Sequence, residues 1–149
     1  VHFVMTAHVL FPNIDTEHPA TMSSKIIRKI LREEFEYDGL IVSDDMEMKA
    51  VRGRYPLDYQ LEQSTKAGVD LFLMCKEHDL QQEAFEILVK IQERSSDFTN
   101  LCRQSCQRLQ KYLDFKQNTS TPTAIPSLSV VGSESHQTYA DIFNAHHRT

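Results

Sequence analysis

Two adjacent carboxylates at the end of an apolar run are the residues of this chain best placed for chemistry. Leu-Ile-Val at residues 40–42 leads through one serine to Asp44 and Asp45. A continuous apolar run is typical of a parallel strand buried on both faces, and parallel sheets carry reactive groups at the carboxyl ends of their strands. No basic residue stands between Arg32 and Lys49. Asp44 is therefore a candidate catalytic residue, although either Asp could simply cap the following turn.

Two further strand ends carry polar side chains. Residues 1–7 are β-rich and end at His8, and the apolar run 69–74 ends at Cys75. If the three runs are neighbours in one sheet, His8 lies at the same edge as Asp44, either as a hydrogen-bonded structural residue or as a direct proton carrier. For Cys75 we expect a core thiol rather than a nucleophile.

Helical spacing of apolar side chains predicts the elements around these strands. Residues 23–36 and 57–67 are expected as helices between the strands, and residues 79–92 and 97–115 as two successive helices after the third. The order strand, helix, strand, helix, strand predicts right-handed parallel crossovers and an α/β fold.

The residue types at the expected helix ends support these boundaries. Ser23 or Ser24 is a plausible N-cap of the first helix, and Asp79 of the third. Pro56 near the start and Gly68 just past the end frame the second helix.

Composition changes after the last predicted helix. Residues 1–116 form the expected α/β portion, and residues 117–149 are a Ser/Thr/Pro-rich linker or an extended wrap. Residues 136–145 could add a terminal helical turn, docked or frayed.

Overall composition excludes several classes of function. A net charge of −5 and a pI near 5.8 argue against nucleic acid as a partner, and no apolar run approaches the length of a membrane span. The three cysteines are odd in number and two lie four apart on one predicted helix, so we expect reduced thiols and a cytoplasmic protein. No residues stand at zinc-ligand spacing, and no metal or other cofactor is predicted.

Three parallel strands cannot close a sheet by themselves. Two bare strand edges would remain, and such edges promote self-association. A TIM (β/α)8 barrel takes roughly 250 residues, so we expect this chain to be the carboxyl-terminal part of one, followed by helices and a polar tail.

Several ordered motifs resemble glycoside hydrolase family 3, and within it the bacterial β-N-acetylhexosaminidases (β-N-acetylglucosaminidases) of peptidoglycan recycling. The similarity extends from residue 4 to about residue 75 and weakens beyond. It lies in Met-Thr-Ala-His-Val-Leu-Phe-Pro at 5–12, Pro-Ala-Thr-Met-Ser at 19–23, Leu-Arg-Glu-Glu-Phe at 31–35, Tyr-Asp-Gly-Leu-Ile-Val-Ser-Asp-Asp-Met-Glu-Met at 37–48 and Lys-Ala-Gly-Val-Asp at 66–70.

This resemblance implies a retaining glycosidase that releases terminal β-linked N-acetylglucosamine, with muropeptides as the expected carbohydrate substrate. Asp44 matches the nucleophile that attacks the anomeric carbon, and His8 belongs to a strand end that lines the pocket, which makes it a candidate substrate-binding residue. In the resembled enzymes the proton donor is a His, paired with an Asp, on an earlier loop. No such loop is found in residues 1–149, so we expect the isolated chain to be an inactive fragment.

Two other functions stay open. The chain could be a non-catalytic structural remnant of a glycosidase. It could also be a magnesium-dependent phosphoryl-transfer domain, which would need further carboxylates at the neighbouring strand ends and a Gly-rich phosphate loop. The neighbouring ends carry His8 and Cys75 instead, and no such loop is present.

Overall fold

A computed structural model describes residues 1–119, 133–134 and 137–138 of the chain. The chain divides into two compact units, Val1–Gln117 and Asn118–Thr149. The predicted linker and the terminal helical turn fall largely outside the described residues.

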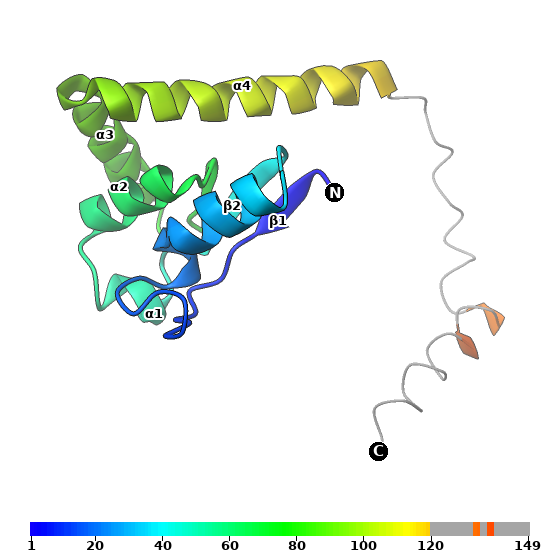
Figure 1. Ribbon diagram of the computed structural model, residues 1–149, viewed down its shortest axis with the longest axis horizontal. Helices are drawn as coiled ribbons and strands as arrows, with labels where there is room; N and C mark the ends of the chain where they lie inside the picture. Colours follow the sequence, from blue (N-terminus) through cyan, green and yellow to red (C-terminus); the bar gives the residue numbers. More distant parts are fainter. Residues whose placement is uncertain (120–132, 135–136, 139–149) are drawn as a thin grey trace. The chain divides into compact units, whose positions relative to one another are not determined.

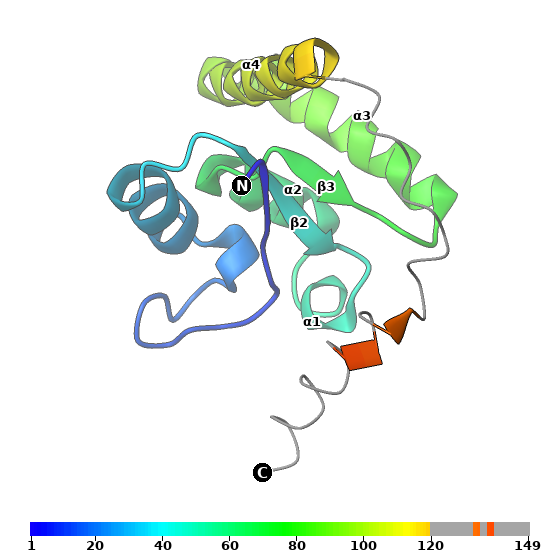
Figure 2. The same cartoon turned by 90° about the vertical axis from the view of Figure 1, so that its right-hand side faces the viewer.

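The first unit is built on a sheet of three parallel strands. These are β1 (Phe3–Met5), β2 (Leu40–Asp45) and β3 (Leu71–Leu73), in the spatial order β1-β2-β3 (Figures 1 and 2). Phe3 pairs with Leu40, and Met5 pairs with Val42. The predicted α/β fold with parallel crossovers is therefore confirmed for these three strands.

Among the described residues, the four longer helices occur where the apolar spacing predicts them, and the two short helices, η1 (Ala20–Met22) and α1 (Lys49–Arg52), were not predicted. The longer helices are η2 (Lys25–Glu34), α2 (Leu57–Ala67), α3 (His78–Arg94) and α4 (Ser96–Thr119). The short helix α1 lies just beyond the tip of β2 (Figure 2).

The helix η2 differs from the expected α-helix in its winding. The Phe35 amide donates to the Ile30 carbonyl at 2.9 Å, and the Lys29 amide donates to the Ser24 carbonyl at 3.1 Å. These bonds span five residues, which defines a π-helix and is rare over ten residues. The apolar spacing correctly predicted a helix but carries no information on this wider turn.

The predicted ends of α2 agree with the structure, whereas α3 and α4 extend beyond their predicted limits and α4 continues to Thr119. Gly68 adopts φ 114° and its amide donates to the Ser64 and Thr65 carbonyls, so it ends α2 as only glycine does without strain. The Ser23 hydroxyl accepts from the Ile26 amide at 3.3 Å. The prediction of Asp79 as the cap of α3 is wrong, because the helix begins one residue earlier and Asp79 lies in its first turn.

The buried core lies between β2 and the two helices η2 and α2. Ile27, Ile41, Ala67 and Val69 are each at most 1% exposed. On β1, by contrast, Phe3 is 42% and Met5 61% exposed. The three apolar runs predict three buried strands, but only β2 has fully buried residues, because Leu71–Leu73 of β3 are partly exposed and little in the described part of the chain covers β1. In that same part, no helix has both the length and the apolar character needed to cross a membrane.

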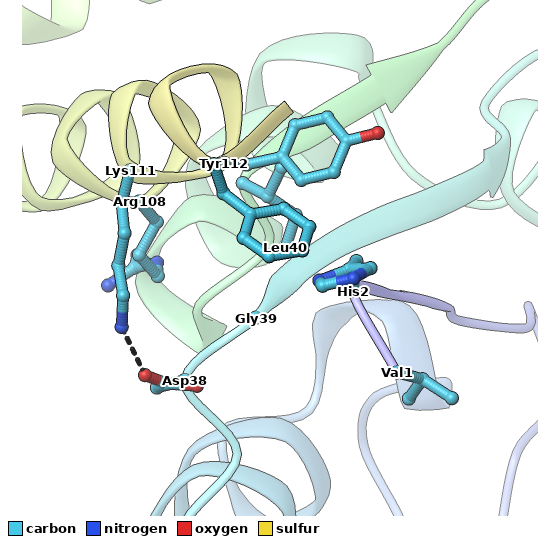
Figure 3. Close-up of a pocket in the computed structure, with 9 residues that line it drawn as sticks. Val1, His2, Asp38, Gly39, Leu40, Arg108, Lys111 and Tyr112 are labelled. Carbon is cyan, nitrogen blue, oxygen red and sulfur yellow. Dashed lines mark hydrogen bonds and ion pairs between the residues drawn. The ribbon is translucent and has the colours of Figure 1, made fainter. Parts of the chain in front are cut away.

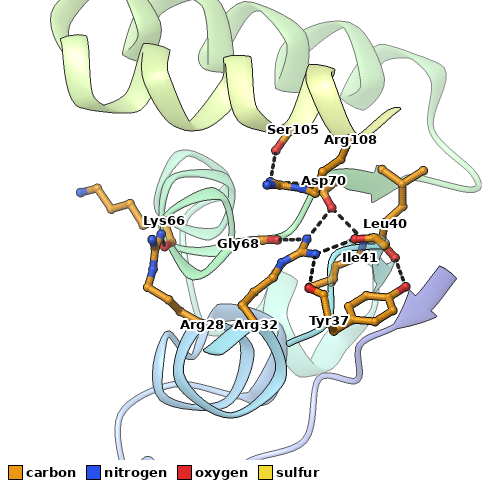
Figure 4. A network of polar contacts seen from close by, with 11 residues as sticks. Arg28, Arg32, Tyr37, Leu40, Ile41, Lys66, Gly68, Asp70, Ser105 and Arg108 are labelled. Atoms are coloured by element: carbon orange, nitrogen blue, oxygen red, sulfur yellow. Dashed lines mark hydrogen bonds and ion pairs between the residues drawn. The ribbon is translucent and has the colours of Figure 1, made fainter. Parts of the chain in front are cut away.

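A buried carboxylate joins four elements at the amino edge of the sheet (Figure 4). Asp70, whose side chain is 1% exposed, accepts from the Arg32 guanidinium at 2.7 Å and from the Ile41 amide at 2.9 Å through one oxygen. Its other oxygen accepts two bonds from Arg108 on α4, at 2.9 and 2.7 Å. Burial lowers the pKa of Arg32, and the charge of Asp70 opposes that shift. An arginine nevertheless stays protonated, so two guanidinium cations share the single carboxylate of Asp70.

Gly39 allows the chain to pass through this cluster. A Cβ at this position would lie 2.4 Å from the Tyr37 hydroxyl and 2.9 Å from the His2 carbonyl oxygen. Both are closer than real Cβ contacts allow. The Gly39 carbonyl accepts from Arg32 at 2.6 Å. A larger residue would therefore move the start of β2 away from the Arg32 guanidinium.

We predict that Asp70→Asn lowers the free energy of unfolding by about 3–5 kcal/mol, because it leaves two half-buried guanidinium groups without their counter-charge. The measurement is urea unfolding followed by circular dichroism. Lys111→Ala is the matched control, since it removes an ion pair with Asp38 in which both side chains are mostly exposed. Its unfolding midpoint should hardly move. Equal midpoint shifts in the two variants would contradict a central role for Asp70.

Candidate active site

The carboxyl end of β2 contains an irregularity next to Asp44. Val42 pairs with Leu71, and Asp45 pairs with Leu73, so β2 advances three residues while β3 advances two. This extra residue is a β-bulge, a feature that re-aims side chains and occurs often beside active sites. β2 also extends through both carboxylates, so Asp44 stands within the bulged end of the strand.

The two carboxylates have different surroundings. Asp45 accepts from the Glu47 amide at 3.1 Å, which is the turn-capping role considered from the sequence. Asp44 is partly exposed, and the one hydrogen bond that its carboxylate receives within the described residues comes from the adjacent Asp45 amide at 2.8 Å. Asp44 thus keeps oxygen lone pairs available at the carboxyl edge.

His8 lies at the same edge of the sheet, as expected. Its Nε2 is 3.0 Å from the carbonyl oxygen of Asp45. Its Nδ1 is buried and has no hydrogen-bond partner in the described part of the chain. The structure therefore brings His8 to the backbone beside Asp44, and substrate binding by His8 stays a prediction.

The thiol of Cys75 is not the core group expected from the sequence. Cys75 is exposed and lies two residues beyond β3. Desolvation raises the pKa of this thiol, and the negative charge of Asp45 raises it further. The sulfur is therefore protonated at neutral pH, which argues against a nucleophilic role.

Glu47 is a structural acid of this edge that the sequence analysis missed. Its side chain is buried, and its two oxygens accept from the backbone amides of Lys76 at 2.8 Å and Glu77 at 2.7 Å. Arg52 in turn donates to both oxygens of Glu77. The loop after β2 is thus tied to the loop after β3. Nothing in the sequence around Glu47 distinguishes it from a solvent-facing acid.

A second buried acid, Asp15, anchors the loop that follows β1. It accepts from the Ser23 hydroxyl at 2.7 Å and from the amides of Glu17 and His18. Burial alone would raise the pKa of Asp15, but these hydrogen bonds outweigh it and lower the pKa. The stabilisation by this carboxylate is therefore present at neutral pH and lost in strong acid.

One cavity of the structure lies away from this edge (Figure 3). Its volume is about 250 Å³, and its lining includes His2, Gly39, Leu40 and Tyr112. These residues belong to the amino ends of β1 and β2 and to α4, so the cavity is at the opposite end of the strands from Asp44. It is not part of the candidate site.

The geometry does not favour a magnesium site at the carboxyl edge. Among the residues that the structure describes, no three His, Cys, Asp or Glu side chains are grouped so that they could hold a metal ion. Both oxygens of Glu47 are already occupied by backbone amides. Within the described residues, no grouping of carboxylates therefore supports the phosphoryl-transfer alternative.

Comparison with known proteins adds independent information. The sequence model described as the glycosyl hydrolase family 3 N terminal domain matches residues 1–111. The β-hexosaminidase of Nitrosomonas eutropha is 39% identical over 89 residues, which are 60% of this chain and 24% of that relative. The β-hexosaminidase of Neisseria gonorrhoeae is 38% identical over 80 residues, 54% of this chain and 22% of the relative.

Solved structures agree with the sequence matches. The β-N-acetylglucosaminidase from Thermotoga maritima superposes with a TM-score of 0.70 at 36% identity, covering 76% of this chain and 25% of that one. A glycoside hydrolase family 3 β-N-acetylglucosaminidase from Paenibacillus sp. gives a TM-score of 0.72 at 31% identity, covering 95% of this chain and 27% of that one. The chain thus spans about a quarter of the length of the relatives that it matches.

We predict that Glu47→Gln lowers the free energy of unfolding by about 1–3 kcal/mol. The side-chain NH2 of the glutamine would replace one oxygen and face a backbone N–H, so that two donors would meet without an acceptor. Hydrogen exchange of the Lys76 and Glu77 amides should accelerate in the same variant. The control is Glu77→Gln, which changes an exposed ion pair and should leave both amides protected. Unchanged exchange in Glu47→Gln would show that Glu47 does not hold the loop.

Proposed function

Because the chain belongs to glycoside hydrolase family 3, we propose that it supplies the nucleophile-bearing part of a retaining β-N-acetylglucosaminidase. In this proposal Asp44 is the catalytic nucleophile. The support is twofold: the family match covers residues 1–111, and several relatives at 34–39% identity are named β-hexosaminidase or β-N-acetylglucosaminidase.

The observation that carries the proposal is the contrast between Asp44 and the other acids of its edge. The carboxylates of Asp45 and Glu47 accept hydrogen bonds from backbone amides of the turn after β2 and the loop after β3. Asp44, partly exposed like Asp45, receives one bond from the next residue in its own strand and caps no loop of the described chain. A nucleophilic carboxylate needs this combination of rigid backbone and available oxygen.

The proposed reaction has two steps. An Asp44 oxygen attacks the anomeric carbon while the glycosidic C–O bond breaks, and the leaving oxygen takes a proton from a general acid. Water then cleaves the glycosyl–Asp44 ester and restores the carboxylate. The family resemblance assigns the acid to a His on a loop that is not found in residues 1–149, so we propose that another segment supplies it.

The substrate proposal follows from the same relatives. The two solved structures are named β-N-acetylglucosaminidases. We therefore propose terminal β-linked N-acetylglucosamine as the sugar that is released. We propose muropeptides from peptidoglycan recycling as the natural source and the cytoplasm as the compartment. The free thiols of Cys75, Cys102 and Cys106 support a reducing compartment.

We predict that Asp44→Ala abolishes turnover in a hybrid enzyme, in which residues 1–111 of this chain replace the segment that they match in the Nitrosomonas eutropha β-hexosaminidase. The assay substrate is an aryl N-acetylglucosaminide. Loss of the nucleophile should lower kcat by about 10³-fold or more. A fluorinated N-acetylglucosamine analogue that traps the glycosyl-enzyme should label Asp44 in the unmutated hybrid, as read by peptide mass spectrometry.

Asp45→Ala is the matched control, because it changes the neighbouring carboxylate that caps the turn. It should keep far more activity than Asp44→Ala. Full activity of Asp44→Ala would remove Asp44 from the mechanism, and a label on Asp45 would shift the assignment by one residue. A folded hybrid without turnover would also contradict the proposal.

We predict that the 149-residue chain by itself shows no turnover of the same aryl substrate and self-associates. General acid catalysis contributes about 10²- to 10⁴-fold in rate, and this chain has no proposed donor of that proton. The partly exposed Phe3 and Met5 lie on β1, an edge strand of the described sheet, which favours pairing between copies. Size-exclusion chromatography with light scattering would measure the association. A monodisperse monomer with the turnover of a full-length relative would contradict both expectations.

A further inference from the structure

The orientation of the His8 ring follows from its two nitrogens. Nε2 is 3.0 Å from the carbonyl oxygen of Asp45. A carbonyl oxygen can only accept a hydrogen bond, so Nε2 must carry the proton. Nδ1 is buried without a partner in the described part of the chain. A proton on Nδ1 would leave a buried charged donor unsatisfied, which costs more than an unsatisfied neutral acceptor. The contacts therefore favour the neutral ring with its proton on Nε2.

The group that His8 holds is part of the bulge beside Asp44. The carbonyl of Asp45 and the amide of Met46 belong to one peptide unit. His8 binds the carbonyl from the end of β1, and the Leu73 carbonyl accepts from the Met46 amide at 2.9 Å on the side of β3. This peptide unit is thus held by His8 from the segment after β1 and by Leu73 of β3, and it begins one residue beyond Asp44, the proposed nucleophile.

We propose that His8 is a positioning residue for Asp44: its Nε2 proton holds the Asp45 carbonyl and fixes the bulge that aims the Asp44 carboxylate. The role rests on the proposed function of Asp44. It also excludes His8 as the general acid, because the single N–H of the neutral ring is already donated to the backbone. An error of about 1 Å in the position of a reacting group can cost about 10²-fold in rate.

The first test uses the 149-residue chain itself. In a ¹⁵N-labelled sample at neutral pH, two-bond ¹H–¹⁵N correlation spectra distinguish the two neutral tautomers of each histidine. The His8→Gln variant identifies the His8 signals by their loss. We expect the tautomer with the proton on Nε2. The other tautomer, or rapid averaging between the two, would overturn the proposal.

The second test separates the two nitrogens in the hybrid enzyme. In His8→Gln the side-chain amide nitrogen is as many bonds from Cβ as Nε2 and can donate to the same carbonyl, so kcat should stay within about threefold of the parent. His8→Asn places a polar atom at the Nδ1 position but cannot reach the Asp45 carbonyl. It should lower kcat about 10- to 100-fold with little change in KM.

The remaining outcomes distinguish this proposal from its premise. A raised KM with unchanged kcat in His8→Asn would indicate a substrate contact instead of positioning, and parent-like kinetics would remove His8 from the mechanism. Full activity of Asp44→Ala would instead defeat the proposed function, whatever the tautomer of His8. Thermal unfolding of both His8 variants shows whether a loss of kcat follows from reduced stability, which would also overturn the positioning role.

Discussion

The buried carboxylate of Asp70 is the interaction on which the rest of this fold depends. It accepts from Arg32 of η2, from Arg108 of α4 and from the Ile41 amide of β2, and Arg32 also bonds the Gly68 carbonyl after α2. Without it the Ile41 amide would lose its hydrogen-bond partner and the two guanidinium groups would lose their counter-charge. The amino edge of the sheet is consequently fixed by charge as well as by the apolar core around Ile41.

The carboxyl edge uses carboxylates in a different way. There the acids accept from backbone amides: Asp15 holds the loop after β1, Asp45 the turn after β2, and Glu47 the loop after β3. Backbone amides are fixed donors, so each bond fixes the course of a loop. Asp44 stands among these ordered loops with most of its own hydrogen-bonding capacity unused in the described structure. The proposed nucleophile is set apart here by what its neighbours bind.

Local sequence was sufficient wherever local physics decides the outcome. The limits of α2 follow from Pro56 and Gly68, because the ring of the first and the φ of 114° at the second fix backbone conformation directly. The apolar run into Asp44 likewise predicted a strand, because a continuous apolar run is typical of a buried parallel strand. The π winding of η2 and the exposed position of Cys75 escaped prediction, since both depend on how distant segments pack.

The sequence by itself determined the fold class, the parallel order of the strands and the prominence of Asp44, because hydrophobic periodicity and strand-end acids are visible in the order of residues. Only the tertiary structure decided which acids are structural. Glu47 bonds amides 29 and 30 residues away, and Asp70 pairs with arginines 38 residues away on either side. Contacts across such separations depend on the folded path of the chain, and no local pattern of residues specifies them.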